Sequence, residues 1–205
     1  MKQLNWSLFD PKNYLHDNYI QLHGEDKKII KILAKFYHKM PRLNLTCEIG
    51  AGPNLYPIMA TLPVTNNIEA VEYSPRNVIY LKKQKKCIDT FWNLYLKLFL
   101  KENELYKIDF VRELKKKLHI KQGSIYELST NRYDLSSMHF VAESITDKKR
   151  KFKDACLKFI LSVKSGGYLV ASFMENSKGY KVGDIVFPSY SVNKNILEQL
   201  FIPHT

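Results

Sequence analysis

One glycine-containing turn constrains the fold of this 205-residue chain more than any other feature. It reads Glu48-Ile49-Gly50-Ala51-Gly52-Pro53 and follows a short segment, 43–49, that is typical of a buried strand. We expect a helix after the turn, around 55–61, because proline fits the first turn of a helix, where its missing N–H needs no partner. A strand that leads through a G-x-G turn into a helix is typical of nucleotide-binding folds built on a parallel sheet.

The rest of the chain alternates strands and helices in the same manner. Apolar runs predict further strands at 68–72, 119–122, 133–141 and 168–174. Helical spacing and turn residues predict helices at 77–86, 109–118, 149–162 and 192–201. Strands that are separated by helices imply βαβ units, so the predicted class is α/β with a parallel sheet.

Two further helical regions are expected around this core. One lies before Pro41 and carries apolar side chains at helical spacing, namely Ile29, Ile30, Leu33, Phe36 and Tyr37. The other covers 87–120 and has one predicted apolar face, formed by Phe91, Leu94, Tyr95 and Leu98. The predicted organisation is an N-terminal helical region, 1–40, followed by a single domain, 41–205.

Composition excludes several classes of protein. The apolar share of 45% suits a globular domain, and no run reaches the roughly 18 apolar residues of a membrane span. The N-terminus lacks the apolar core of a secretion signal, so a cytoplasmic protein is expected. The cysteines are far apart in the sequence, which predicts free thiols and no metal site; they are Cys47, Cys87 and Cys156.

The net charge of +12 raises the possibility of a nucleic-acid partner. The basic residues concentrate in three runs, at 82–86, 115–117 and 148–151. These runs contain mostly lysine, and they fall where exposed helices are expected. Solvated helix faces are therefore the favoured interpretation, and a nucleic-acid partner is disfavoured.

The glycine turn has the properties of a cofactor site. Gly50 can adopt backbone angles that are closed to other residues, and Gly52 has no Cβ, so a ligand can lie against the main chain. Position 54, where a dinucleotide fingerprint has its third glycine, is Asn54. An acid before the turn suits a cofactor with an amino-acid end, because Glu48 can face a cationic centre while backbone N–H groups meet a carboxylate.

A second carboxylate supports this interpretation. Glu72 ends the second predicted strand, at the spacing where nucleotide sites place the acid that accepts hydrogen bonds from ribose hydroxyls. The glycines alone could form an ordinary strand-to-helix turn. Together with Glu72 they favour a site for a nucleoside-containing cofactor.

Several segments resemble a known family in their order and spacing. They are Phe9 to Tyr19, the glycine turn with Tyr56, Glu72 to Asn77, the pair Phe91-Trp92, Phe140 to Thr146 and Ser165 to Val170. These look like the signatures of the nicotinamide, phenylethanolamine and thioether methyltransferase family, with 140–146 closest to its bacterial branch. The resemblance implies a Rossmann-like class I methyltransferase core under an N-terminal helical lid. It also implies the cofactor S-adenosyl-L-methionine (SAM), with S-adenosyl-L-homocysteine (SAH) as product.

The resemblance also implies roles for individual residues. Tyr14 and Tyr19 would belong to the lid, with Tyr14 also a catalytic candidate, and Tyr56 would contact the methionine portion of SAM. Ser124, which stands where the family has an acid, would be on the adenine side. The full predicted cofactor set is Tyr14, Tyr19, Glu48, Gly50, Ala51, Gly52, Tyr56, Glu72, Tyr73, Asn77, Ser124 and Ile125.

The acceptor side is predicted at the carboxyl ends of strands four and five. Methyl transfer requires a neutral acceptor that is held in line and shielded from water. Glu143 is the first candidate to orient an amine or take its proton, and the alternative is that it caps the following turn. Weaker substrate contacts are Glu175, Ser177 and Tyr180, and Tyr180, Phe187 and Tyr190 either line an aromatic pocket or pack in the core.

Three functions remain open at this stage. The favoured one is transfer of a methyl group to a small-molecule amine. Nicotinamide itself is disfavoured as acceptor, because Phe173 stands where the nicotinamide enzyme has an acid. A nucleic-acid methyltransferase is disfavoured, because no N-P-P-Y-type tetrapeptide follows strand four. A catalytically silent or partner-completed binding protein on the same scaffold is the remaining alternative.

The C-terminal part predicts an open sheet edge. Methyltransferases of this fold usually continue past strand five and a helix into an antiparallel hairpin, and after the helix at 192–201 no residues remain for one. The apolar strand 168–174 would then have unpaired N–H and C=O groups. We therefore expect a second copy of the chain, or a partner chain, to cover this edge.

Overall fold

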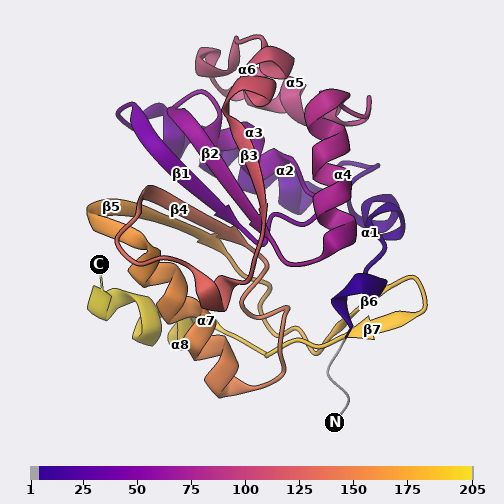
Figure 1. Cartoon of the computed structure of the whole chain (residues 1–205), viewed down its shortest axis with the longest axis vertical. Coiled ribbons are helices and arrows are strands. Elements are labelled where there is room, and N and C mark those ends of the chain that lie inside the picture. Colours follow the sequence, from indigo (N-terminus) through magenta and orange to yellow (C-terminus); the bar gives the residue numbers. More distant parts are fainter. Residues whose placement is uncertain (1–4, 205) are drawn as a thin grey trace.

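A five-stranded parallel sheet forms the centre of the computed structural model, which describes residues 5–204 (Figure 1). The strands are β1 (Leu43–Ile49), β2 (Thr65–Glu72), β3 (Leu118–Gln122), β4 (Tyr133–His139) and β5 (Val163–Ser172), in the order β3-β2-β1-β4-β5. The chain runs outward from β1 in one direction and from β4 in the other. The carboxyl ends of β1 and β4 therefore flank the switch point, where open α/β sheets bind their ligands. The predicted class I core is confirmed.

Helices cover both faces of the sheet (Figure 1). The first core holds side chains of α2 (Gly24–His38), α3 (Tyr56–Thr61), α4 (Pro75–Lys86), α5 (Trp92–Glu102) and α6 (Phe110–Lys117). The second core holds side chains of α7 (Lys149–Ser162) and α8 (Lys194–Phe201). Because strand residues alternate between faces, Cys47 and Ile49 enter the second core, and Glu48 between them faces the first. Short 3-10 helices are η1 (Trp6–Leu8), η2 (Glu104–Tyr106), η3 (Ile125–Glu127) and η4 (Ile202–His204).

Several details of the predicted elements are wrong, and two of them concern α5 and β5. The buried face of α5 consists of Trp92, Tyr95 and Phe99, whereas Leu94 is 45% exposed. Phe91, the N-cap residue of α5, and Leu98 are only partly buried against the same core. Strand β5 begins at residue 163 rather than 168, because the segment predicted as a turn pairs with β4 through an irregular register.

A small hairpin, which the sequence analysis did not assign, follows β5. Its strands, β6 (Tyr180–Val182) and β7 (Ile185–Phe187), pair antiparallel in a separate sheet. With η1 and α1 (Pro11–Asn18) they form a third core of Phe9, Val182 and Phe187. Figure 1 shows the hairpin below α1 at the right of the view. The N-terminal segment that was predicted to form a lid therefore packs against this hairpin; residues 1–4 of the predicted lid region lie outside the described residues.

Strand β5 is an edge of the main sheet in the described part of the chain. It pairs with β4 on one side, and no hairpin is added beyond it. Its apolar side chains Tyr168 and Val170 are half-buried against the first core. Across residues 5–204, no helix is long and apolar enough to cross a membrane.

Candidate functional site

The glycine turn is tied to the end of β2 by Glu72. One carboxylate oxygen of Glu72 accepts a hydrogen bond from the Gly52 N–H at 2.7 Å, and the other accepts from the Ser74 N–H at 2.6 Å. The Gly50 N–H donates to the Val71 carbonyl at 2.8 Å. The turn and the predicted ribose acid therefore form one hydrogen-bonded unit at the carboxyl edge of the sheet.

The two glycines of the turn are required for different reasons. Both have positive φ, 61° at Gly50 and 56° at Gly52, which favours glycine. A Cβ at Gly50 would lie 2.6 Å from the methyl groups of Val141, so this position is closed by packing. A Cβ at Gly52 would meet nothing nearer than 3.8 Å. A Cβ at Gly52 would therefore make only ordinary van der Waals contact with the backbone, so this position is limited by its positive φ rather than by packing.

The end of β2 has unused hydrogen-bonding capacity. Glu72 is buried and accepts three hydrogen bonds, the third from the Asn77 side-chain amide at 3.3 Å. Burial raises the pKa of Glu72, and the bonds from Ser74 and Gly52 act against that rise. A carboxylate offers about four acceptor positions. Within residues 5–204 the Asn77 Oδ1 and the Ser74 hydroxyl have no partner, so this cluster can accept or donate to ribose hydroxyls.

A surface groove of about 510 Å³ continues from this cluster past β3. It contains the predicted residues Tyr73 and Ser124, together with Trp6 from η1, which the sequence analysis missed. The Ser124 hydroxyl accepts from the Tyr126 N–H at 3.2 Å, and Ile125 is buried below. The remaining lining residues are Asn5, Ser7, Pro75, Gln122, Gly123 and Glu127. This groove lies where the predicted adenine contacts belong.

The lid reaches the glycine turn through a chain of tyrosines. The rings of Tyr14 and Tyr19 are 5.7 Å apart, and those of Tyr19 and Tyr56 are 6.0 Å apart. The Tyr19 hydroxyl accepts from the side-chain amide of Asn54, whose oxygen accepts from the Tyr56 N–H. Tyr95 also holds the lid, because its hydroxyl donates to the Tyr19 carbonyl at 3.0 Å. The predicted lid is thus anchored to Asn54, which directly follows Pro53 at the end of the glycine turn.

Glu143 lies buried just beyond the end of β4. Its Oε1 accepts from the Met174 N–H at 2.9 Å, and its Oε2 has no partner in the described part of the chain. Burial raises the pKa of Glu143 to about 7. Burial also raises the pKa of Tyr14 and of Tyr180, and the charges of Glu143 and Glu72 contribute to both rises. Two lid tyrosines therefore lie in the electrostatic field of both acids.

Glu48 lies deeper in the sheet than predicted. It pairs in register with Ser137, two residues before the end of β4, and the Ser137 hydroxyl donates to its carboxylate. Burial raises the pKa of Glu48 to about 8. The carboxyl group of Glu48 therefore lies below the edge of the sheet. A cationic group would have to enter below that edge to contact it.

His139, which the sequence analysis did not select, lies at the same edge of the sheet. It is the last residue of β4 and only 7% exposed, and its Nδ1 is 2.9 Å from the Ser172 hydroxyl oxygen. Its Nε2 is buried without a partner among residues 5–204, and its ring meets Tyr56 edge to face at 6.4 Å. A residue at the end of a strand beside the switch point is a candidate site residue, and this signal could have identified His139. The predicted strand continued to 141, so His139 was taken to lie inside it.

Other predicted acceptor contacts are not brought together. Tyr190 lies against the second core, where it stacks on Phe152 at 5.0 Å, so for this residue the core-packing alternative holds. Phe187 is fully buried in the third core. Glu175 is exposed and forms an isolated β-bridge with Val192. Ser177 is half-buried.

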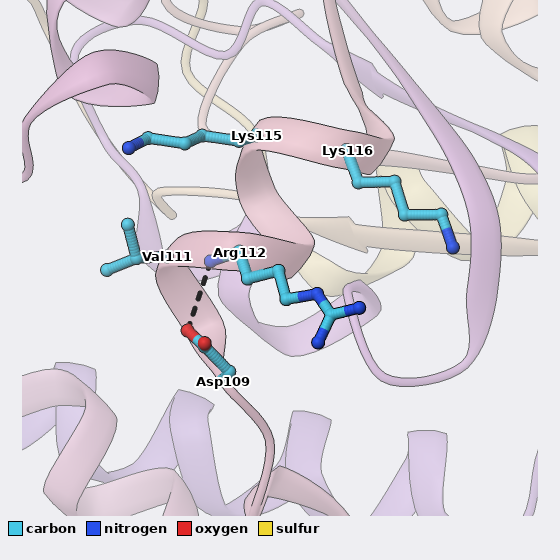
Figure 2. Close-up of a pocket in the computed structure, with 5 residues that line it drawn as sticks. All are labelled: Asp109, Val111, Arg112, Lys115 and Lys116. Carbon is cyan, nitrogen blue, oxygen red and sulfur yellow. Dashed lines mark hydrogen bonds between the residues drawn. The ribbon is translucent and has the colours of Figure 1, made fainter.

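A second hollow, on the outer face of α6, carries no convergent set of groups. It is lined by Asp109, Val111, Arg112, Lys115 and Lys116. Figure 2 shows Lys115 pointing to one side of the helix and Arg112 and Lys116 to the other, while Asp109 accepts from the Arg112 N–H. These diverging side chains form a solvated basic face.

Solved structures with the same fold are methyltransferase-like. DhpI in complex with SAH has 10% identity and a TM-score of 0.56, over 87% of this chain and 75% of that one. The phosphoethanolamine N-methyltransferase 2 of Haemonchus contortus, bound to SAM, has 12% identity and a TM-score of 0.53, over 86% of this chain and 36% of that one. The N-methyltransferase NodS of Bradyrhizobium japonicum has 12% identity and a TM-score of 0.52, over 74% and 69% of the two chains.

The family is settled by sequence. A search of curated proteins gives no match. The model of the NNMT/PNMT/TEMT family, in contrast, matches residues 2–202, which is nearly the whole chain. The chain therefore belongs to the NNMT/PNMT/TEMT family, and it is a methyltransferase whose cofactor is SAM.

Proposed function

We propose that the protein methylates a small-molecule amine that binds beneath the two-part lid. The observation that carries the proposal is the buried Glu143, whose Oε2 is left without a partner while Tyr14 and Tyr180 lie in its field. A buried acceptor oxygen is costly unless a ligand satisfies it. An amine N–H is a suitable partner, because the hydrogen bond orients the nitrogen lone pair away from the carboxylate.

SAM supplies an electrophilic methyl group on a sulfonium centre. Glu143 would position the amine and hold the proton that it releases, since a pKa near neutrality suits both states at physiological pH. Tyr14 would close the site above the acceptor. The lid excludes water, and most of the catalysis would come from positioning.

The proposed cofactor contacts follow the edge of the sheet. The backbone of 50–52 would hold the amino-acid end, with Tyr19 and Tyr56 above it. Glu72 and Asn77 would bind the ribose. Tyr73, Ser124 and Ile125 would surround the adenine. The unpartnered polar atoms and the absence of a steric clash at Gly52 among the described residues support this placement.

The class of acceptor has support from fold relatives. The phosphoethanolamine enzyme and NodS are both named N-methyltransferases, although their low identity transfers the fold rather than the substrate. The acceptor can be identified by incubating the protein with a metabolite extract and SAM carrying a deuterated methyl group. Mass spectrometry should show a labelled amine with wild type and none with Glu143→Ala. If SAH binds but no metabolite is ever labelled, the catalytically silent alternative is favoured.

We also propose that the free edge of β5 is covered in the functional protein, by a second copy of the chain or by a partner chain. The support is the pairing of β5 with β4 alone and the half-buried Tyr168 and Val170.

The expected cytoplasmic location stays a prediction.

A further inference from the structure

The position of His139 relative to the glycine turn follows from strand register. Glu48 pairs with Ser137 and Ile49 with Met138, so the next step places His139 beside Gly50. Side chains alternate along a strand, so His139 lies on the same sheet face as Ser137 and Glu48. The imidazole is thus beside the turn, at the end where the amino-acid part of SAM is expected.

The imidazole is held on one side and free on the other. Ser172 on β5 contacts Nδ1 at 2.9 Å, and Tyr56 packs against the ring. Nε2 is buried and has no partner in the described chain, and the hydroxyl of Tyr56 is likewise unpartnered. Two unpartnered polar groups on adjacent rings are the arrangement expected where a ligand group completes the hydrogen bonding.

The surroundings favour a positively charged group at this point. Asp26 is an acidic electrostatic neighbour of Tyr56, and Glu48 is kept largely neutral near pH 7 because burial raises its pKa to about 8. Glu48 is already engaged by Ser137 beneath the edge of the sheet. The N–H groups of Gly50 and Gly52 are already donated, to Val71 and Glu72, and the turn presents no side-chain acceptor to an ammonium group. An acceptor for the ammonium group is therefore needed, and Nε2 of His139 is an uncommitted acceptor beside the turn.

We propose that Nε2 of His139 accepts a hydrogen bond from the α-ammonium group of SAM. The proposal rests on the SAM site described above and assigns its amino-acid end. It requires the tautomer in which Nδ1 carries the proton and donates to Ser172, which leaves the lone pair on Nε2. Burial lowers the pKa of His139 to about 4, which keeps the ring neutral and able to accept.

Calorimetry with three ligands tests the proposal. The ligands are SAH, an SAH analogue that lacks the α-amino group, and 5′-methylthioadenosine, which lacks the whole amino-acid end. His139→Leu removes the acceptor, and His139→Gln keeps one near the position of Nε2. We expect His139→Leu to bind SAH about 10- to 100-fold more weakly than wild type, His139→Gln to recover part of the loss, and both variants to bind the other two ligands as wild type does.

The outcomes separate this inference from the cofactor site itself. Unchanged SAH binding by His139→Leu would overturn the inference, and so would an equal loss for all three ligands, since that indicates a structural role. A third outcome is that wild type binds 5′-methylthioadenosine but binds SAH no more tightly than the analogue without the α-amino group. In that case the inference fails while the nucleoside site stands. Long-range 1H–15N NMR of wild type gives a check without substitution, because a protonated Nε2 in the SAH complex contradicts the proposal.

Discussion

The carboxylate of Glu72 accepts a hydrogen bond from the Gly52 N–H at 2.7 Å, across 20 residues of sequence. The same carboxylate also accepts from Ser74, so it fixes the turn after β1 and the loop after β2 together. The acid expected to bind ribose is therefore also the group that shapes the cradle. Substitution of either Gly52 or Glu72 should therefore change the shape of the turn and weaken cofactor binding.

The two glycines of the turn should respond differently to alanine. Gly50→Ala should lower the free energy of unfolding strongly, because its Cβ would lie 2.6 Å from Val141 and its φ is positive. Gly52→Ala should cost only about 1–2 kcal/mol for the left-handed backbone, yet weaken SAH binding, because its methyl group enters the cradle. Urea denaturation and calorimetry measure the two effects. The double variant Gly50→Ala, Val141→Ala is the control and should recover stability; no recovery would contradict the packing argument.

Two buried acids predict a pH dependence of stability. Burial raises the pKa of Glu48 to about 8 and that of Glu143 to about 7, from 4.5. The folded protein therefore holds protons that the unfolded chain releases, so these groups make stability fall as pH rises from about 4.5 to 8. The lowered pKa of His139 acts oppositely below about 6.5, and it cancels when variants are compared with wild type.

Glutamine at these positions cannot ionise. The loss of unfolding free energy between pH 5 and pH 8 should be smaller in Glu48→Gln and in Glu143→Gln than in wild type, by roughly 2–4 kcal/mol each. Denaturant titrations at the two pH values measure this. Parallel pH profiles for wild type and both variants would show that neither acid is protonated in the folded protein.

The two halves of the lid should open together. Phe9 packs on Phe187 of the hairpin at 5.4 Å and on Tyr14 at 5.1 Å, so Phe9→Ala removes the ring that joins them. We expect protease sites in both 5–23 and 180–187 to become accessible, with turnover reduced. Deletion of residues 1–23 should abolish turnover. Ile32→Ala, at a 65% exposed position of α2, is the matched control. Cleavage confined to one of the two segments would mean that they are not coupled.

The edge of β5 should determine the state of association. Light scattering during chromatography should show a dimer or a larger complex for wild type, or a complex formed with a partner protein from the same source. Ala171→Lys, at an exposed position of β5, should weaken association, because a charged side chain disfavours pairing at a sheet edge. A monodisperse wild-type monomer with full activity would refute the covered edge.

The cofactor half of the site could be predicted from sequence because its geometry is local. A strand, a G-x-G turn and an acid at the end of the next strand place Gly50, Gly52 and Glu72 at one edge whatever the rest of the chain does. Their hydrogen bonds follow from that placement. The strand order follows too, since helices between strands leave few arrangements of a parallel sheet.

The acceptor half was less predictable because it depends on long-range packing. The strands of the hairpin have three residues each, too few to show alternation, so 180–187 carried no strand signal. Tyr190 and Tyr180 look alike in sequence, and only the path of the chain after β5 places one in the second core and the other under the lid. His139 was hidden by an error of two residues in a strand boundary.

Calorimetric titration of SAH into wild type and Glu72→Ala tests the central claim most directly. The account predicts saturable binding by wild type and a loss of about 1.5–3 kcal/mol in Glu72→Ala, because charge-assisted hydrogen bonds to the ribose disappear and the Gly52 turn loses its acceptor. Glu69→Ala, which removes a carboxylate of β2 that pairs with Arg132 away from the site, should bind as wild type does. Two results would contradict the site described here. One is that wild type gives no heat of binding with SAH at about millimolar concentration, which is near the weakest affinity that the method measures. The other is that wild type and Glu72→Ala bind SAH equally well.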